Sequence, residues 1–142
     1  NPDGYKLEMS AAASQFGQTF DSWGNYFLVN NSNHIFQELI SEQYLQRNPE
    51  LLVTRVTQTL SDHGQPADVF PITKNPQHQL LTDVGVFTSA SGLERYLGGA
   101  FPTEFNNVSF VTESVSNLVH ADHLTESHLS HYSHRDQACG VA

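Results

Sequence analysis

The stretch Asp21-Ser-Trp-Gly-Asn-Tyr-Phe-Leu-Val-Asn-Asn-Ser-Asn-His-Ile-Phe36 has the pattern of an aromatic-rich strand, a polar turn and a second apolar strand. The same plan returns roughly eighty residues later in Phe105-Asn-Asn-Val-Ser-Phe-Val-Thr-Glu-Ser-Val-Ser-Asn-Leu-Val-His120. Repeated hairpins indicate a repeat architecture. A period of about forty residues, or a multiple of it, is typical of four-stranded propeller blades. The sequence therefore predicts an all-β fold.

The composition limits the classes of function. Fifteen acidic and six basic residues give a net charge of −9, which argues against nucleic acid because phosphate binding needs clustered Lys and Arg. No apolar run is long enough to predict a membrane span. Cys139 is the single cysteine, so the sequence offers no internal disulfide and no thiolate metal cluster.

The predicted elements suggest part of a propeller. Residues 1–124 have room for about three four-stranded antiparallel blades, and Ser41 to Arg47 favour a short helix that Asn48-Pro49 ends. Residues 125–142 form a His- and Ser-rich tail or a last strand. Trp23 is expected to pack between blades, and other aromatic residues complete that core: Phe16, Phe20, Phe27, Phe87, Tyr96, Phe101 and Phe110.

Several separate phrases carry a resemblance to a known family. They are the run from Gln15 to Ile35, Tyr44-Leu-Gln-Arg-Asn-Pro49, Thr88-Ser-Ala-Ser-Gly-Leu93 and Ser116-Asn-Leu-Val-His120. In this order they resemble the propeller of the membrane-bound dehydrogenase family of planctomycete-type bacteria. That propeller is similar to soluble quinoprotein glucose and sorbosone dehydrogenases, and the resemblance covers roughly residues 1–124.

The resemblance implies a periplasmic or extracytoplasmic protein that oxidises a sugar or alcohol with bound pyrroloquinoline quinone and Ca²⁺. The chain holds no Cys-x-x-Cys-His motif, so we expect no haem in it and a c-type haem partner elsewhere. Exposed sheet edges template association, which predicts that remaining blades or another protein chain complete the ring. Whether this chain alone is an enzyme stays open.

The resemblance also suggests residues for the chemistry. His34 is the candidate base for the substrate hydroxyl, and the alternative is that it only caps a blade turn. Cations and amides would hold the quinone, and the candidates are Arg47, Arg95, Asn33, Asn117 and His120. His120 occupies the position in the second hairpin that corresponds to His34 in the first. For Arg47 the alternative is a surface cation at a helix end.

The C-terminal histidines suggest a separate metal site. His128, His131 and His134 follow one another at intervals of three residues, and imidazole is the commonest protein ligand of transition metals. No single regular element presents all three to one ion, so the alternative is an exposed polar tract.

Two functions from different classes follow. One is a dehydrogenase-like propeller fragment or subunit, and the other is a noncatalytic module that binds carbohydrate or another protein subunit. The first needs His34 in a concave pocket near an Arg. The second predicts a surface lined by aromatic and amide side chains.

Overall fold

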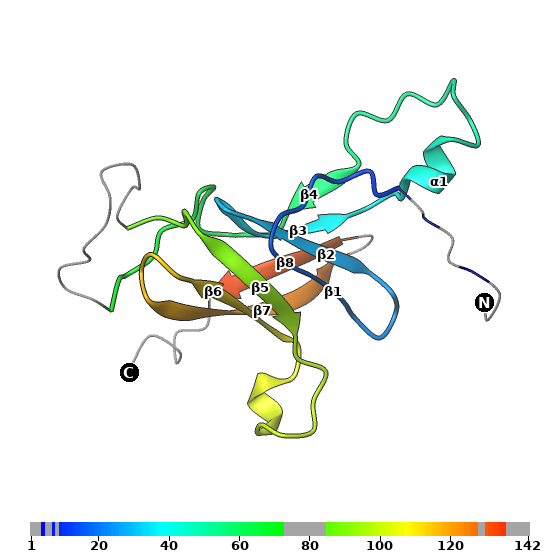
Figure 1. The fold of residues 1–142 in the computed structure, drawn as a ribbon. Coiled ribbons are helices and arrows are strands. Elements are labelled where there is room, and N and C mark those ends of the chain that lie inside the picture. Colours follow the sequence, from blue (N-terminus) through cyan, green and yellow to red (C-terminus); the bar gives the residue numbers. More distant parts are fainter. Residues whose placement is uncertain (1–3, 5–6, 8, 73–84, 128–129, 136–142) are drawn as a thin grey trace.

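The structure, a computed structural model, describes residues 4, 7, 9–72, 85–127 and 130–135, and its strands form two antiparallel sheets of four strands each. The strands follow chain order in both sheets (Figure 1). The first sheet contains β1 (Gln18–Phe20), β2 (Tyr26–Asn30), β3 (Asn33–Glu38) and β4 (Thr57–Thr59). The second contains β5 (Ala90–Arg95), β6 (Val108–Glu113), β7 (Leu118–Ser127) and β8 (Ser130–Arg135). The predicted all-β class is confirmed, but the part of the chain that the structure describes forms two four-stranded sheets where the sequence predicted about three blades within residues 1–124.

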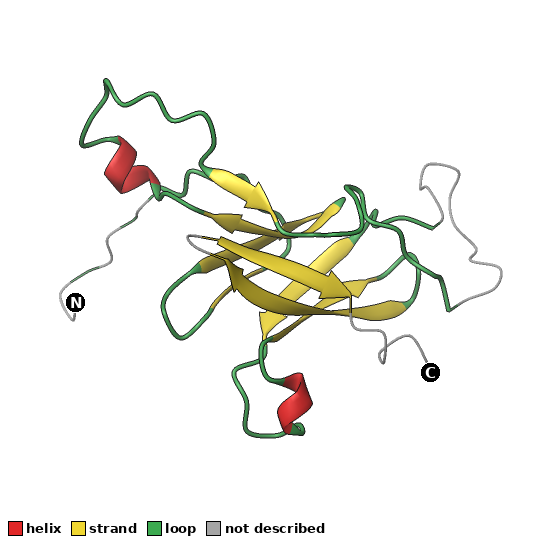
Figure 2. Cartoon of the chain, turned by 180° about the vertical axis from the view of Figure 1, so that it is seen from behind, coloured by secondary structure: helices red, strands yellow, loops and turns green. Residues whose placement is uncertain are grey.

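Two short helices connect strands. Helix α1 (Glu42–Leu45) lies between β3 and β4, inside the segment 41–47 that the sequence predicts as helical. The 3₁₀ helix η1 (Thr103–Phe105) lies between β5 and β6 and extends away from both sheets (Figure 2). In the described part of the chain, no helix is long and apolar enough to cross a bilayer.

The two repeated phrases fold as predicted. The first forms the β2–β3 hairpin and the second forms the β6–β7 hairpin. Each hairpin is the middle pair of its four-stranded sheet, so the two copies occupy equivalent places. Asn117 closes the second hairpin at a φ of 54°, a left-handed conformation that asparagine tolerates better than most residues.

One apolar core lies between the sheets. The first sheet contributes Phe27, Val29 and Ile35 to a buried cluster that continues into the second sheet and the loops through Leu60, Ala67, Val69, Phe87, Ala90, Leu93, Val111 and Leu124. Strand β5 crosses the first sheet and lies against β1, β2 and β3. The strand with the most complete burial is β3, whose six residues are all covered.

The sheets are also linked by backbone hydrogen bonds. Gly92 of β5 donates to the carbonyl of Phe16 at 2.8 Å. At the opposite edge, Ser133 of β8 donates to the carbonyl of Leu60 at 3.0 Å, while the amide of Leu60 donates to Ile35 at 3.2 Å. These bonds satisfy edge groups that would otherwise be free to pair with another chain.

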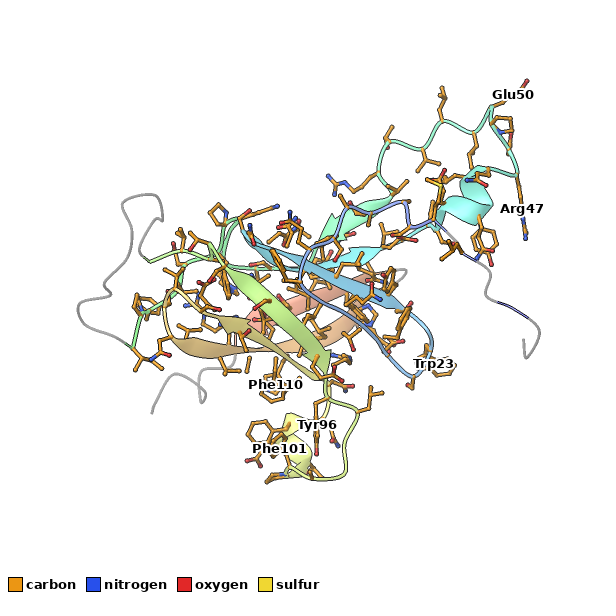
Figure 3. The ribbon with its side chains drawn as sticks, viewed as in Figure 1. Trp23, Arg47, Glu50, Tyr96, Phe101 and Phe110 are labelled. Carbon is orange, nitrogen blue, oxygen red and sulfur yellow. The ribbon has the colours of Figure 1, made fainter. Side chains whose placement is uncertain are left out.

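The expected aromatic core is correct only in part. Phe27 and Phe87 are fully buried, but Trp23 is 83 % exposed and Phe16, Phe20 and Phe101 are also exposed. The prediction for Trp23 is wrong because it lies in a tight turn outside the core (Figure 3). The carboxylate of Asp21 accepts the amides of Trp23 and Asn25, both at 2.9 Å, and these local bonds fix the turn without packing of the indole.

A β-bulge determines which side chains of β3 face the second sheet. Leu28 pairs with Phe36 and Asn30 pairs with Asn33, so two residues of β3, His34 and Ile35, oppose one residue of β2. A bulge of this kind re-aims a side chain. Both His34 and Ile35 are buried between the sheets, although strict alternation would send one of them to the opposite face.

Gly17 fixes the approach of the first sheet to β5. A Cβ at this position would lie 2.8 Å from the backbone nitrogen of Leu93 and 3.0 Å from a methyl carbon of Val29. We expect Gly17→Ala to lower the free energy of unfolding by about 1–3 kcal/mol, the usual cost of overpacking. Urea unfolding checks it, with Gly24→Asn as control because the space around Gly24 is open and asparagine tolerates its φ of 83°. An equal loss in both variants would contradict the close approach.

Candidate metal centre

His34 lies at the centre of a buried polar cluster between the two sheets. Its side chain is 1 % exposed, and its ring stacks on Phe87 with a centroid distance of 4.4 Å and an interplanar angle of 14°. Nε2 of His34 lies 2.8 Å from Oδ2 of Asp122 on β7. The bulge in β3 and the loop that carries Phe87 therefore hold the imidazole in one orientation.

Asp122 joins His34 to a second histidine. His120 and Asp122 are two residues apart on β7, so the alternation of a strand places both on the face toward the first sheet. Nε2 of His120 lies 2.9 Å from Oδ1 of Asp122. Each carboxylate oxygen thus contacts one imidazole, and the carboxylate is 1 % exposed.

His63 brings a third imidazole from the loop after β4. Its ring centroid lies 5.1 Å from that of His34 and 5.3 Å from that of His120. Nδ1 of His63 contacts Oδ1 of Asp62 at 2.7 Å. Nε2 of the same ring is buried and has no hydrogen-bond partner among the described residues, which is costly for a polar atom out of water.

The four side chains meet the distance requirement of a metal site. One nitrogen from each of His34, His63 and His120 and one oxygen of Asp122 all lie within 4.8 Å of one another. Asp62 contacts Nδ1 of His63 in the way that an outer-shell carboxylate contacts a metal-binding histidine. Such a carboxylate commonly fixes the tautomer and orientation of the imidazole. Asp62 also contacts Nδ1 of His134 through its other oxygen, at 2.9 Å.

The protonation states favour metal binding. Burial lowers the pKa of His34, and although the hydrogen bond and charge of Asp122 act in the opposite direction, its pKa stays below the ordinary value. Burial by itself raises the pKa of Asp122, but hydrogen bonds from His120 and His34 outweigh it and hold that pKa well below the ordinary value. A neutral imidazole beside an ionised carboxylate is the form in which these groups bind a cation.

The protein-family model called Domain of unknown function (DUF7133) matches residues 1–140. The chain belongs to the DUF7133 family. No curated protein and no solved structure matches the chain.

In this DUF7133 chain, two residues that the sequence singled out come together. His34 and His120, from the equivalent hairpins of the two repeats, have ring centroids 5.0 Å apart. The repeat pattern was the signal for this pair. The role of His34 as a catalytic base and that of His120 as a quinone contact stay predictions.

None of the other predicted cofactor contacts is among the four residues of the cluster. Arg47 is exposed beside Tyr44 near α1, with its guanidinium carbon 5.0 Å from the ring centroid (Figure 3). Arg95 is buried and donates from Nη1 to the carbonyl of Asn107 at 2.7 Å. Asn33 donates to the hydroxyl of Thr59, and Asn117 is exposed in the β6–β7 turn. Each of these positions has a structural explanation within the DUF7133 fold.

The two described histidines of the predicted C-terminal metal site in the DUF7133 chain, His131 and His134, do not face the same side of β8. His131 is buried on the inner face of β8, where Nδ1 lies 3.1 Å from Oε1 of Gln37, whereas His134 is exposed on the other face. A separation of three residues on a strand places side chains on opposite faces. His128 lies outside the described residues. The segment 125–142, expected as a tail or last strand, holds the end of β7 and all of β8 in its described part.

Two members of the cluster were not among the predicted site residues. Asp122 lies in the His-rich stretch of the sequence, but nothing there indicates that it faces His34. His63 lies in the polar loop Asp62-His-Gly-Gln-Pro66. The available signal was the adjacent Asp62-His63 pair, since a carboxylate that orients an imidazole is typical of metal centres.

His131, which is not part of the metal cluster, is expected to make the stability of the protein depend on pH. Burial and the positive charge of Arg95 lower its pKa, and the carboxylates of Asp21 and Glu126 only partly oppose them. Below the ordinary value of 6.5 the unfolded chain therefore binds the proton more readily than the folded one. The contribution of neutral His131 to the stability of the folded state is complete above that pH. It is lost as the pH falls toward the folded-state pKa.

We expect the wild type to lose more stability than His131→Gln between pH 7.5 and pH 5.5 in urea unfolding, at pH values chosen on either side of about 6.5. Equal losses in the two proteins would show that His131 keeps an ordinary proton affinity in the folded state.

Proposed function

We propose that the domain binds one divalent transition-metal ion through His34, His63, His120 and Asp122, and that this ion joins the two sheets. The observation that carries the proposal is the buried Nε2 of His63, which lacks a partner among the described residues beside two further imidazoles and a carboxylate. The hydrogen bonds that join His34, Asp122 and His120 are complete without His63 and leave its Nε2 unexplained. A metal ion supplies the bond that His63 otherwise lacks.

Zinc fits the donor set best. Three nitrogens and one carboxylate oxygen form the four-coordinate shell that zinc prefers, with ligand atoms about 3.3 Å apart when Zn–N is near 2.05 Å. The closest pairs now lie at 2.8 and 2.9 Å and the whole set lies within 4.8 Å, so small side-chain shifts reach that geometry. Ca²⁺ takes six to eight oxygen ligands. The cluster therefore does not fit the Ca²⁺ that the dehydrogenase resemblance implies.

The position of the ion gives it a structural role. His34 comes from β3 of the first sheet, His120 and Asp122 come from β7 of the second, and His63 comes from the loop after β4. Four protein ligands close the shell, as in structural zinc sites, and leave no position for substrate. The ion would connect segments that are far apart in the sequence and stabilise the folded state only.

Cobalt titration of the chelator-stripped protein tests the proposal. We expect one Co²⁺ per chain with the intense visible bands of tetrahedral coordination, and displacement by one equivalent of Zn²⁺. His63→Ala and Asp122→Asn should weaken binding by about a hundredfold or more, since even outer-shell changes cost ten- to a hundredfold. Far-UV circular dichroism checks that both variants fold.

The matched control is His123→Gln, which removes an imidazole from β7 next to Asp122 but on the opposite face of the strand. It should bind Co²⁺ like the wild type. Absence of the tetrahedral bands in the folded wild type, or bands that persist in His63→Ala, would overturn the four-ligand site.

A second candidate is a propeller that oxidises a sugar or alcohol. Its support is the repeat of a four-stranded sheet with strands in chain order, which is the topology of a propeller blade, and the His34–Asp122 pair, which has the form of an oriented general base. On this proposal the two sheets are two blades, and further blades come from elsewhere. The described residues do not gather a quinone site around His34, because Arg95 contacts Asn107 and Arg47 lies near α1.

A dye-coupled assay with glucose and ethanol, with and without added quinone, tests this candidate. Quinone-dependent turnover that His34→Gln abolishes would support it. Zinc binding without quinone-dependent turnover would favour the structural metal centre alone.

A further inference from the structure

Three polar side chains connect the buried metal cluster to solvent. The four proposed ligands are all largely buried, and the most exposed of them is His63, at 16 %. Asp62, which contacts His63, is 39 % exposed, and His134, which contacts Asp62, is 60 % exposed. Exposure therefore rises step by step from the cluster to the surface along His63, Asp62 and His134.

The contacts along this line are continuous. Oδ1 of Asp62 lies 2.7 Å from Nδ1 of His63, and Oδ2 of Asp62 lies 2.9 Å from Nδ1 of His134. The other nitrogen of His63, Nε2, is the buried atom without a partner among the described residues. A single imidazole ring therefore separates the half-exposed carboxylate of Asp62 from the proposed metal position.

The backbone places Asp62 where it can reach both sides of the second sheet. The amide and the hydroxyl of Ser133 on the edge strand β8 both donate to the carbonyl of Leu60, at 3.0 and 3.2 Å. Ser133 is buried, and the alternation of the strand turns the next residue, His134, outward. Asp62 follows Leu60 by two residues, so its carboxylate joins the interior to the outer face around the edge of β8.

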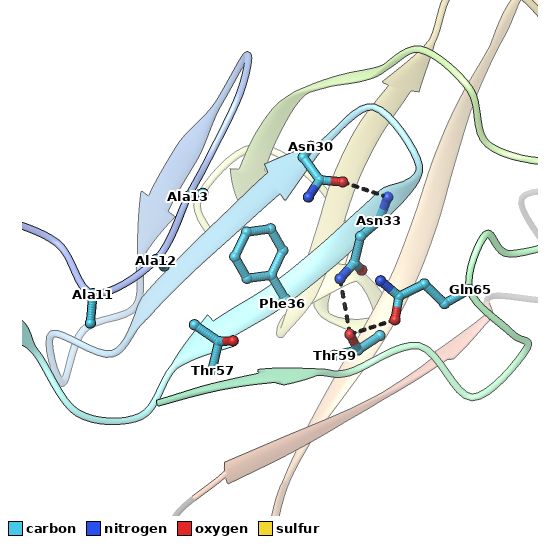
Figure 4. Close-up of a pocket in the computed structure, with 9 residues that line it drawn as sticks. All are labelled: Ala11, Ala12, Ala13, Asn30, Asn33, Phe36, Thr57, Thr59 and Gln65. Atoms are coloured by element: carbon cyan, nitrogen blue, oxygen red, sulfur yellow. Dashed lines mark hydrogen bonds between the residues drawn. The ribbon is translucent and has the colours of Figure 1, made fainter. Parts of the chain in front are cut away.

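Apolar packing closes the cluster on the side of Phe87. This fully buried ring has its centroid 4.4 Å from that of His34 and 5.3 Å from that of His120. A cavity of about 300 Å³ lies beside the β2–β3 hairpin, but none of the four ligands lines it (Figure 4). None lines the cavity of about 460 Å³ next to Trp23 either. A divalent ion is costly to bring through apolar surroundings, so the polar line through His63 suits its passage.

We propose that Asp62 and His134 form an entry site, where a divalent transition-metal ion binds first and from which it passes to the four-ligand centre. This site rests on the metal centre proposed above and adds the route by which that centre is filled. Its two facing atoms are 2.9 Å apart, like the closest pairs of the cluster at 2.8 and 2.9 Å, so one ion can bind both. Two protein ligands leave the other positions to water, so the ion is held less tightly than in the closed shell.

Stopped-flow mixing of Co²⁺ with the chelator-stripped full chain tests the proposal. The tetrahedral bands report binding, and excess chelator added to the loaded protein reports release. His134→Gln keeps a group that can donate a hydrogen bond to Asp62 but removes a good transition-metal ligand. We expect its association to be about tenfold slower, which corresponds to about 1.4 kcal/mol in the barrier. Release should slow by the same factor, because both directions cross the same barrier, so the dissociation constant stays the same.

His134→Glu is the complementary variant. Its carboxylate can bind a divalent cation but, when ionised, cannot donate a hydrogen bond to Asp62. We expect its association rate to stay within about threefold of the wild type, less than the tenfold that corresponds to about 1.4 kcal/mol in the barrier. Tyr132→Gln changes an exposed side chain on the same face of β8, two residues earlier, and is the control that should bind and release Co²⁺ like the wild type.

The outcomes separate the entry site from the metal centre. Tetrahedral bands in the wild type, with an unchanged association rate in His134→Gln, would rule out the entry site and leave the metal centre in place. A weaker affinity in both His134 variants, or slow association in His134→Glu, would show instead that His134 only positions Asp62. Absence of the bands in the folded wild type would remove the metal centre and its entry site together.

Discussion

Zinc added to the metal-free protein is expected to raise its melting temperature by about 10 °C. An ion that binds only the folded state stabilises it by about 4 kcal/mol when its free concentration is a thousand times the dissociation constant. For a domain of this size each kcal/mol raises the melting temperature by about 3 °C. The effect is large because the proposed ligands come from both sheets and a loop, and unfolding separates them.

Differential scanning fluorimetry at fixed zinc measures this shift, with excess chelator to reverse it. Asp122→Asn keeps the size of the side chain but removes the anionic ligand, and binding about a hundredfold weaker or more should reduce its zinc-dependent shift to about 4 °C or less. Ca²⁺ should leave the wild type unchanged, because the cluster offers mainly nitrogen. An equal shift with Ca²⁺, or with zinc in Asp122→Asn, would place the stabilising ion elsewhere.

Glu113→Ala is expected to lower the free energy of unfolding by about 3 kcal/mol or more. Glu113 is fully buried at the end of β6, and its carboxylate accepts the backbone amide of Ser89 at 2.9 Å and the hydroxyl of the same residue at 2.6 Å. It also accepts the amides of Thr88 and Val115, at 3.2 and 3.1 Å. Its removal takes the acceptor away from several partly buried donors at once, and a buried donor left without a partner costs about 1–3 kcal/mol.

The substitution should also disturb the metal cluster. The loop that Glu113 holds follows Phe87, on which the ring of His34 stacks. Urea unfolding measures the stability, and cobalt binding at low denaturant measures the effect on the cluster. Glu104→Ala, at an exposed site in η1, is the control and should change stability by less than about 0.5 kcal/mol. A comparable loss in Glu104→Ala would show that general charge, not the buried bonds, causes the effect.

Part of the candidate site could be predicted from the sequence. The repeated hairpins placed His34 and His120 at corresponding positions, and the structure brings their rings together. Spacing could not predict the rest, because the remaining ligands include a loop residue, His63, with no periodic relation to either strand. The histidines with regular spacing, His131 and His134, face opposite sides of β8. Regular spacing along one strand therefore predicted the residues of the candidate site less well than the equivalence of the two repeats did.

The sequence by itself determined the two repeated hairpins, because alternating apolar residues and polar turns act between residues close in the chain. It also determined that the two hairpins are equivalent. Only the tertiary structure decided which side chains meet. The bulge at His34 and Ile35 reverses the expected alternation, and the crossing of β5 over the first sheet brings β3 and β7 to a common interior. Register and sheet packing depend on contacts between distant segments, so one shifted residue moves a histidine from one face of a sheet to the other.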